Sequence, residues 1–79
     1  MKHELKTWPE YFKMVASGMK PFELRKNDRG FKVGDTLILL EYNPKYGEYT
    51  GRKRVRKVTC VVENFDGLEE GYCILGLRR

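Results

Sequence analysis

The sequence predicts a small α+β domain that is mainly β, a barrel of about five mostly antiparallel strands with one helix, about residues 8–17, plugging one end. Only one segment spaces its apolar side chains as a helix does. After that segment, apolar and polar residues alternate in several runs, and turn residues separate those runs. The chain has 79 residues, which is enough for a single domain over residues 1–79.

The helix is predicted within "TWPEYFKMVAS". Thr7 and Glu10 have the spacing of a capping box, and Pro9 suits the first helical turn. Four side chains are expected to form one buried face: Trp8, Tyr11, Phe12 and Val15. Gly18 is expected to end the helix. Trp8 is predicted to cover the core rather than to serve as a platform for a base.

The remaining elements are predicted to be strands. They cover residues 3–6, 20–25, 36–42, 52–64 and 72–77. The third of these runs is almost continuously apolar, which predicts burial on both faces. The fourth is unusually long and has two conflicting apolar phases: Val58, Cys60 and Val62 share one face, and Val55, Thr59 and Val61 share the other. A bulge or a barrel bend would reconcile the two phases.

The strand that follows the helix carries a concentration of charge. Alternation places Phe22 and Leu24 on one face, which we expect to enter the core, and Glu23 and Arg25 on the other. Lys20 stands just before them. Lysine can hold a phosphate as a point charge, arginine offers a planar fork, and glutamate can accept from a base edge. Periodicity alone favours a plainer interpretation, an ion pair on a solvated strand face.

The stretch "GMKPFELR", residues 18–25, resembles the G-x-K-x-x-E-x-R signature of ASCH domains, a branch of the PUA-like superfamily. "FKVGD", residues 31–35, resembles the turn that follows it in that family. The likeness rests on motifs over residues 4–42 and on strand order alone over residues 52–77, and it is greatest to a compact prokaryotic and phage branch of unknown function. It implies a cleft for RNA or a modified nucleoside. The ligand-binding candidates are Lys20, Glu23, Arg25, Lys26 and Arg29.

One branch of the ASCH family looks enzymatic, removing the acetyl group of N4-acetylcytidine as an amidohydrolase. That branch looks to use the motif lysine, a threonine three residues later and a further carboxylate. Here the third residue after Lys20 is Glu23, a poor replacement for a nucleophilic hydroxyl. Lys20 and Glu23 remain catalytic candidates as an acid/base pair, with Glu63, Glu69 or Glu70 as the later acid. Binding is predicted in preference to this alternative; a small accessory protein that binds another protein is a third possibility.

The charge balance favours a polyanionic partner. Sixteen Lys and Arg against eleven Asp and Glu leave a net charge of +5. The densest cluster is a candidate nucleic-acid surface, formed by Arg52, Lys53, Arg54, Arg56 and Lys57. Protection of an edge strand explains the same charges equally well. Tyr46 and Tyr49, in the preceding hairpin, are candidates for base stacking, although packing over the hairpin is the more usual role.

The remaining chemistry-bearing residues indicate little. Cys60 and Cys73 lie in apolar runs and are predicted to be buried free thiols, and His3 an ordinary strand or surface histidine. One histidine and two cysteines exclude a Cys-rich zinc site, and no metal or cofactor is expected. No apolar run approaches the ~20 residues that span a bilayer. The sequence predicts a cytoplasmic monomer whose partner is RNA or a nucleotide.

Overall fold

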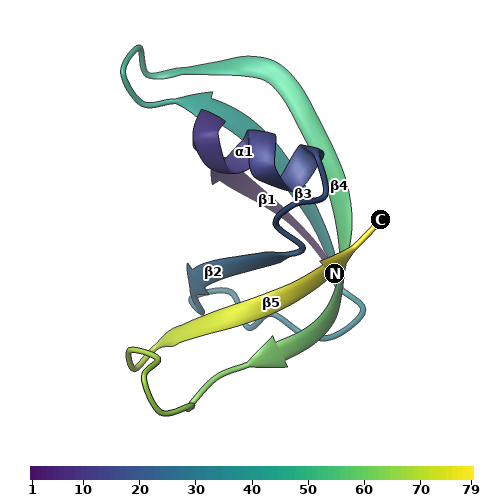
Figure 1. Ribbon diagram of the computed structural model, residues 1–79, viewed down its shortest axis with the longest axis vertical. Helices are drawn as coiled ribbons and strands as arrows, with labels where there is room; N and C mark the ends of the chain where they lie inside the picture. The colour runs from purple at the N-terminus through teal and green to yellow at the C-terminus, as the bar shows by residue number, and fades with distance from the viewer.

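The computed structural model describes residues 1–79 and has one helix and five strands, in the predicted order (Figure 1). The elements are β1 (Lys2–Thr7), α1 (Pro9–Ala16), β2 (Phe22–Lys26), β3 (Thr36–Asn43), β4 (Glu48–Val62) and β5 (Tyr72–Arg78). The strands form a single sheet in the order β1-β3-β4-β5-β2. β1 is parallel to β3, and the other three pairs are antiparallel. The mainly β fold with one short helix is therefore confirmed.

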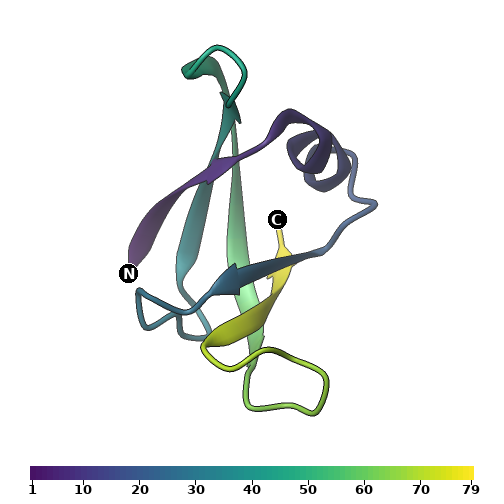
Figure 2. The ribbon, with the colours of Figure 1, turned by 90° about the vertical axis from the view of Figure 1, so that its left-hand side faces the viewer.

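The sheet curls into a half-barrel and does not close. β1 pairs only with β3, and β2 pairs only with β5, so these two strands are the free edges of the sheet. Figure 2 shows both edges turned toward the viewer, with β3, β4 and β5 behind them. The seam between β1 and β2 therefore lacks a backbone hydrogen-bond ladder.

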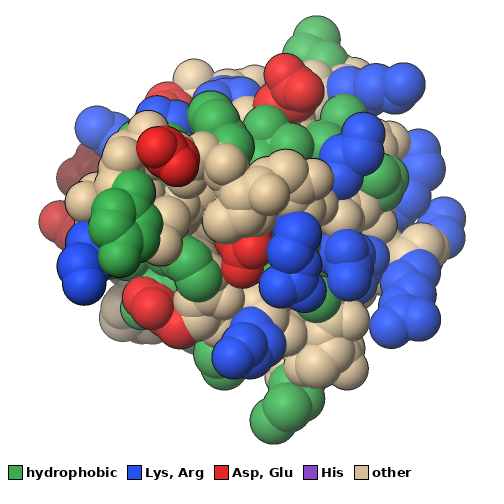
Figure 3. Space-filling view, turned by 90° about the horizontal axis from the view of Figure 1, so that it is seen from above, with side chains coloured by type: hydrophobic (Ala, Val, Ile, Leu, Met, Phe, Trp, Pro, Cys, Tyr) green, Lys and Arg blue, Asp and Glu red, His purple; other side chains and the backbone are tan.

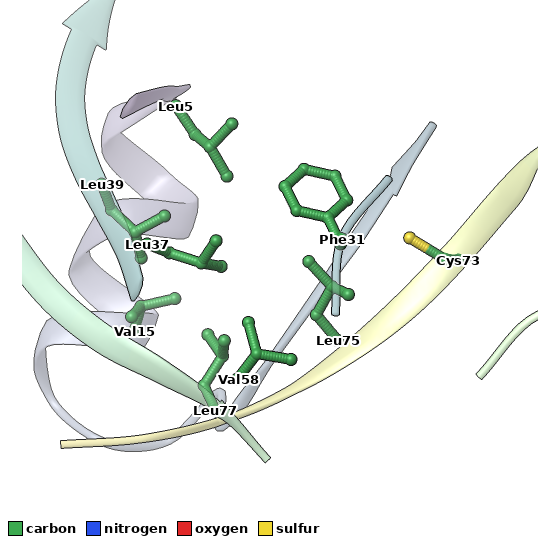
Figure 4. Close-up of a cluster of buried hydrophobic side chains, with 9 residues drawn as sticks. All are labelled: Leu5, Val15, Phe31, Leu37, Leu39, Val58, Cys73, Leu75 and Leu77. Atoms are coloured by element: carbon green, nitrogen blue, oxygen red, sulfur yellow. The ribbon is translucent and has the colours of Figure 1, made fainter. Parts of the chain in front are cut away.

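The core lies between the curled sheet and α1. Nine buried side chains from the helix, the strands and one turn point toward one another (Figure 4): Leu5, Val15, Phe31, Leu37, Leu39, Val58, Cys73, Leu75 and Leu77. Full burial of one such aliphatic side chain stabilises the fold by roughly 1.5–3 kcal/mol. Ile38 and Leu40, on the other face of β3, are only half-buried, so β3 is fully covered on one face and not on both as predicted.

The helix differs from its prediction at its start and on its outer face. Trp8 is the N-cap residue and no side chain caps the helix, because Thr7 belongs to β1 and its hydroxyl points back to the Leu5 carbonyl. The capping-box prediction was wrong. Phe12 is fully buried, whereas Trp8 is 51% and Tyr11 49% exposed. A helix of eight residues can bury only one narrow stripe against the core. It is too short and too polar to cross a membrane.

A bulge in β4 resolves its two apolar phases. The register between β4 and β5 shifts between Val58 and Cys60, so Val58 and Val61 both face the core. The predicted bulge is confirmed. Cys60 is exposed, against its prediction, because the bulge turns it outward; Cys73 is a buried free thiol, as predicted.

The turn before β3 is held by a buried carboxylate. Phe31 enters the core, and Asp35 accepts a hydrogen bond from His3 Nε2 at 2.9 Å and another from the Lys32 backbone N–H at 3.0 Å. The N-terminal amino group lies 3.2 Å from the second oxygen of the same carboxylate. These partners, His3 first, lower the pKa of Asp35 from 3.8 to about 2. His3 is thus a strand residue, as predicted, but a buried one that fastens β1 to this turn.

Candidate functional site

A buried carboxylate is held between two cations where α1 gives way to β2. Lys20 Nζ donates to Glu23 Oε1 at 3.1 Å, and Arg25 Nη1 donates to Glu23 Oε2 at 3.5 Å. The Glu23 side chain is 6% exposed, against 13% for Lys20 and 27% for Arg25. The sequence prediction that these three residues lie together is consistent with this geometry. The two cations compensate the cost of burying the carboxylate.

The two faces of β2 are the reverse of the prediction, which placed Phe22 and Leu24 in the core. Glu23 and Arg25 do share one face of β2, but Phe22 and Leu24 are the exposed pair, at 43% and 54%. The reason is the pairing with β5. Glu23 lies opposite Leu75, an inward-facing core residue of β5, and neighbours across a sheet share a face. The polar face of β2 therefore turns inward, where every buried side-chain polar atom has a partner.

The cluster opens into a cleft of about 560 Å³ between α1, the end of β1 and β2. We call this the cleft; it is lined by Lys6, Thr7, Trp8, Tyr11, Lys20, Phe22, Glu23, Leu24, Arg25, Lys26 and Tyr72. Lys20 Nζ lies 5.1 Å from the ring centroid of Tyr11 and 5.4 Å from that of Phe22. These are cation–π distances, so the ammonium group is fixed by two rings as well as by Glu23.

Sequence reasoning missed the aromatic rim of the cleft. Trp8 and Tyr11 were expected in the core, as was Phe22, and all three are half-exposed here. Their periodicity is that of core residues, so a local pattern gives no signal of this role. The one feature that could have indicated their exposure is the length of the helix. With eight residues, α1 is too short to bury two rows of aromatic side chains.

The other predicted ligand-binding residues are divided between the cleft and its surroundings. Lys26 lines the cleft, whereas Arg29 does not and instead donates to the Glu4 carbonyl at 3.0 Å. None of the three later carboxylates lines the cleft: Glu63, Glu69 and Glu70. Glu63 accepts from the Asn27 side chain at 2.9 Å. No group of three or more His, Cys, Asp or Glu side chains is placed to hold a metal ion.

Comparison with known proteins places the chain in a family. Residues 2–77 match the model of a family described as "Domain of unknown function (DUF3850)". The chain belongs to this family. A relative in Escherichia phage P2, the "Uncharacterized 12.9 kDa protein in GpA 3'region", is 44% identical over 68 residues. That match covers 86% of the chain and 61% of the phage protein, so the chain spans less than two thirds of this relative's length.

The DUF3850 match covers the helix, nearly all of every strand and the complete lining of the cleft. The description of the family assigns it no activity. Roles for the residues of this DUF3850 domain therefore have to come from their chemistry and positions.

Three arginines of the candidate nucleic-acid surface lie on one face of β4, as alternation along a strand predicts: Arg52, Arg54 and Arg56. That face is turned toward α1. Arg52 and Arg54 place their guanidinium carbons 5.4 and 5.6 Å from the ring centroid of Phe12. Arg56 is buried, and its Nη2 donates to the Val15 carbonyl at 3.1 Å. Burial, with the nearby charges of other arginines, lowers the pKa of Arg56. These arginines hold the helix to the sheet, which limits what they can offer a ligand.

The remaining members of this candidate surface differ in exposure. Lys53 is exposed, and Lys57 donates to the Thr36 hydroxyl at 3.1 Å. Tyr46 is 66% exposed, and Tyr49, 53% exposed, packs edge-on against Tyr42 at a centroid distance of 5.0 Å. In the space-filling view from above, Lys and Arg side chains gather over the right-hand half of the face (Figure 3). Positive side chains therefore concentrate on one side of this face.

Proposed function

We propose that the cleft binds a nucleotide, or an unpaired base of RNA, and that the domain is an ASCH-type member of the PUA-like superfamily. One observation carries the binding proposal: a buried Lys20–Glu23–Arg25 cluster forms the polar floor of a cleft whose rim is aromatic. The superfamily assignment rests on the motif of residues 18–25, together with a half-barrel of five strands and one helix. A cytoplasmic, monomeric state stays a prediction.

The floor of the cleft matches the edge of a nucleobase, which carries hydrogen-bond donors and acceptors side by side. Lys20 and Arg25 can donate to a ring nitrogen or carbonyl oxygen. Glu23 accepts one bond at each oxygen, and a carboxylate has lone pairs for more, so an exocyclic amino group can still bind there. A ligand with both kinds of group satisfies this floor better than a simple anion does.

The rim of the cleft suits the face of the base and its phosphate. Trp8 and Tyr11 are each about half-exposed, and stacking of a base on such rings is worth roughly 1–3 kcal/mol. Lys6 and Lys26 stand at the same opening, where they can neutralise a phosphate. This combination of rings and lysines is typical of sites for single-stranded nucleic acid.

A second candidate function is hydrolysis of an acylated nucleoside such as N4-acetylcytidine. Thr7 favours it, because this residue lines the cleft and carries an aliphatic hydroxyl, the group that the motif itself lacks. Its one hydrogen bond, to Leu5 O, is long at 3.5 Å. Product analysis after incubation with N4-acetylcytidine tests this function. Release of cytidine that is lost in Thr7→Val would support it, and absence of turnover would exclude it for this substrate.

Trp8 offers a direct test of binding, because it is the single tryptophan of the chain and lines the cleft. Its fluorescence is followed during titration with nucleoside monophosphates and with single-stranded oligoribonucleotides at low ionic strength. A saturable change is expected, and Lys20→Gln should weaken binding about tenfold or more, since it removes a charge-assisted hydrogen bond.

The matched control for this titration is Lys13→Gln. It removes the same charge from an exposed position of α1 that does not line the cleft. Its affinity should stay within about twofold of the unsubstituted protein. Absence of saturable binding to any nucleotide or oligonucleotide, by fluorescence and by calorimetry, would overturn the proposed function.

A further inference from the structure

A second hollow adjoins the cleft at the open seam of the half-barrel. It has a volume of about 440 Å³, and we call it the seam groove; it is lined by Glu4, Lys6, Arg25, Arg29, Leu40 and Tyr49. Lys6 and Arg25 line both the seam groove and the cleft. The two hollows therefore share a boundary, and a ligand longer than one nucleotide could reach from one into the other.

Two arginines bridge the seam where the sheet lacks a backbone ladder. Arg25 Nη1 donates to the Lys6 carbonyl at 3.2 Å, and Arg29 Nη1 donates to the Glu4 carbonyl at 3.0 Å. Each of these bonds uses only one terminal nitrogen, and a guanidinium group has five N–H donors. The backbone of β1 thus holds both guanidinium groups in place while most donors of Arg29 stay free for a ligand.

The seam groove is strongly biased in charge. Three cations line it, Lys6, Arg25 and Arg29, against the single carboxylate of Glu4. Positioned guanidinium groups bind phosphate as planar forks, with short charge-assisted hydrogen bonds. Tyr49 also lines the groove; its ring packs at a steep angle against Tyr42 and is half-exposed, so part of it is open for stacking.

We infer that the seam groove is a second subsite, which takes the phosphate and base next to the nucleotide in the cleft. The inference rests on the proposed function and extends it: the ligand is a single-stranded polynucleotide rather than a free mononucleotide. The strand passes over Lys6 and Arg25, places a phosphate at Arg29 and brings the neighbouring base to Tyr49. Tyr49, near the start of β4, thereby joins the site through the seam groove and not through the arginines of that strand.

The experiment compares two probes on the same protein, cytidine 5′-monophosphate and a labelled single-stranded oligoribonucleotide of about eight nucleotides. Affinities are measured at several salt concentrations. Arg29→Gln should lower the ratio of oligonucleotide to mononucleotide affinity about three- to tenfold. It should also reduce the salt slope for the oligonucleotide by about 0.7, the value for one phosphate contact on a single strand.

A second variant acts in the opposite direction and leaves Arg29 anchored. Glu4→Gln keeps the backbone carbonyl that Arg29 binds and removes the only negative charge of the groove. It should raise the oligonucleotide affinity about two- to fivefold at low salt. The matched control is Glu70→Gln, which removes the same charge from an exposed loop position. Thermal unfolding of each variant shows whether the fold is retained.

The possible outcomes separate the two claims. Suppose that both probes bind and that each substitution changes the affinity for the oligonucleotide and for the mononucleotide by the same factor. In that case the groove is not a subsite, although the cleft remains a binding site. A longer strand can bind the cleft in several alignments, which raises its apparent affinity over that of the mononucleotide. Because this statistical gain does not depend on Arg29, it cannot produce a lower affinity ratio in Arg29→Gln. If neither probe binds, the proposed function itself fails.

Discussion

Lys20 Nζ lies 3.1 Å from Glu23 Oε1, and both side chains are almost fully withdrawn from water. The two residues are three positions apart in sequence and stand where the chain leaves α1 and enters β2. Because Arg25 approaches the other oxygen of Glu23, one carboxylate orients two cations toward the cleft. The floor of the cleft is therefore arranged before any ligand binds.

Removal of the carboxylate should destabilise the protein. In Glu23→Gln, Lys20 and Arg25 lose their common partner and repel one another at a site with little water. We expect the free energy of unfolding to fall by about 1–3 kcal/mol, measured by urea denaturation. Glu70→Gln, in an exposed loop, should change it by less than about 0.5 kcal/mol. Equal effects of the two substitutions would show that Glu23 is not held as described.

Arg56 is expected to matter for stability. Its Nη2 donates to the Val15 carbonyl in the last turn of α1, where a positive charge also interacts favourably with the helix dipole. Arg56→Met retains the apolar stem and should lower the free energy of unfolding by about 1–3 kcal/mol. Lys53→Met, on the exposed face of the same strand, is the control. A change below about 0.5 kcal/mol for Arg56→Met would contradict this role.

The acid stability of the protein should depend on Asp35. Its pKa is about 2 in the folded state, and 3.8 is its ordinary value, so the unfolded chain binds the proton more readily. The contribution of Asp35 to stability is complete above about pH 4 and is lost as the pH falls toward about 2. The free energies of unfolding of the unsubstituted protein and of Asp35→Asn should therefore converge over this interval.

Denaturation by urea at a series of acidic pH values measures this convergence. Asp66→Asn, at an exposed loop position, provides the comparison and should show no such pH-dependent difference. A difference between Asp35→Asn and the unsubstituted protein that stays constant from about pH 5 to about pH 2 would mean that the His3–Asp35 contact does not form in solution.

The aromatic rim should contribute to binding and not to folding. Trp8 is half-exposed, so Trp8→Ala should change the free energy of unfolding by less than about 1 kcal/mol. Loss of a stacking platform should weaken binding of a labelled oligoribonucleotide by about 1–3 kcal/mol, measured by fluorescence anisotropy. Unchanged affinity in this variant, with Lys20→Gln still impaired, would restrict the contact to the floor of the cleft.

Much of the fold follows from local patterns in the sequence. The helical spacing of apolar residues and the alternating runs are local patterns, and they predicted the order of the elements. The two conflicting apolar phases within β4 are local as well, and they predicted the bulge. Which face of β2 points inward is not a local property. It is fixed by the register with β5, which sets Glu23 opposite Leu75, and no pattern within residues 20–26 contains that information.

The same distinction between local and distant information applies to the candidate site, of which only the proximity of three residues could be predicted. Lys20, Glu23 and Arg25 are neighbours in sequence, so their proximity could be inferred from their spacing. Partners that are distant in sequence could not, as the contact between His3 and Asp35 illustrates. The role of Arg56 was hidden as well, because its alternation with Arg54 is the same whether that face of β4 meets solvent or a helix.

The central claim, that the cleft is the ligand-binding site, is tested most directly by mapping amide chemical shifts. The ¹⁵N-labelled protein is titrated with a single-stranded oligoribonucleotide at low ionic strength. Perturbations should concentrate at the residues that line the cleft and the seam groove, with the largest near Trp8, Lys20 and Arg25. Perturbations confined to the outer face of β4, or none at saturating oligonucleotide, would contradict it.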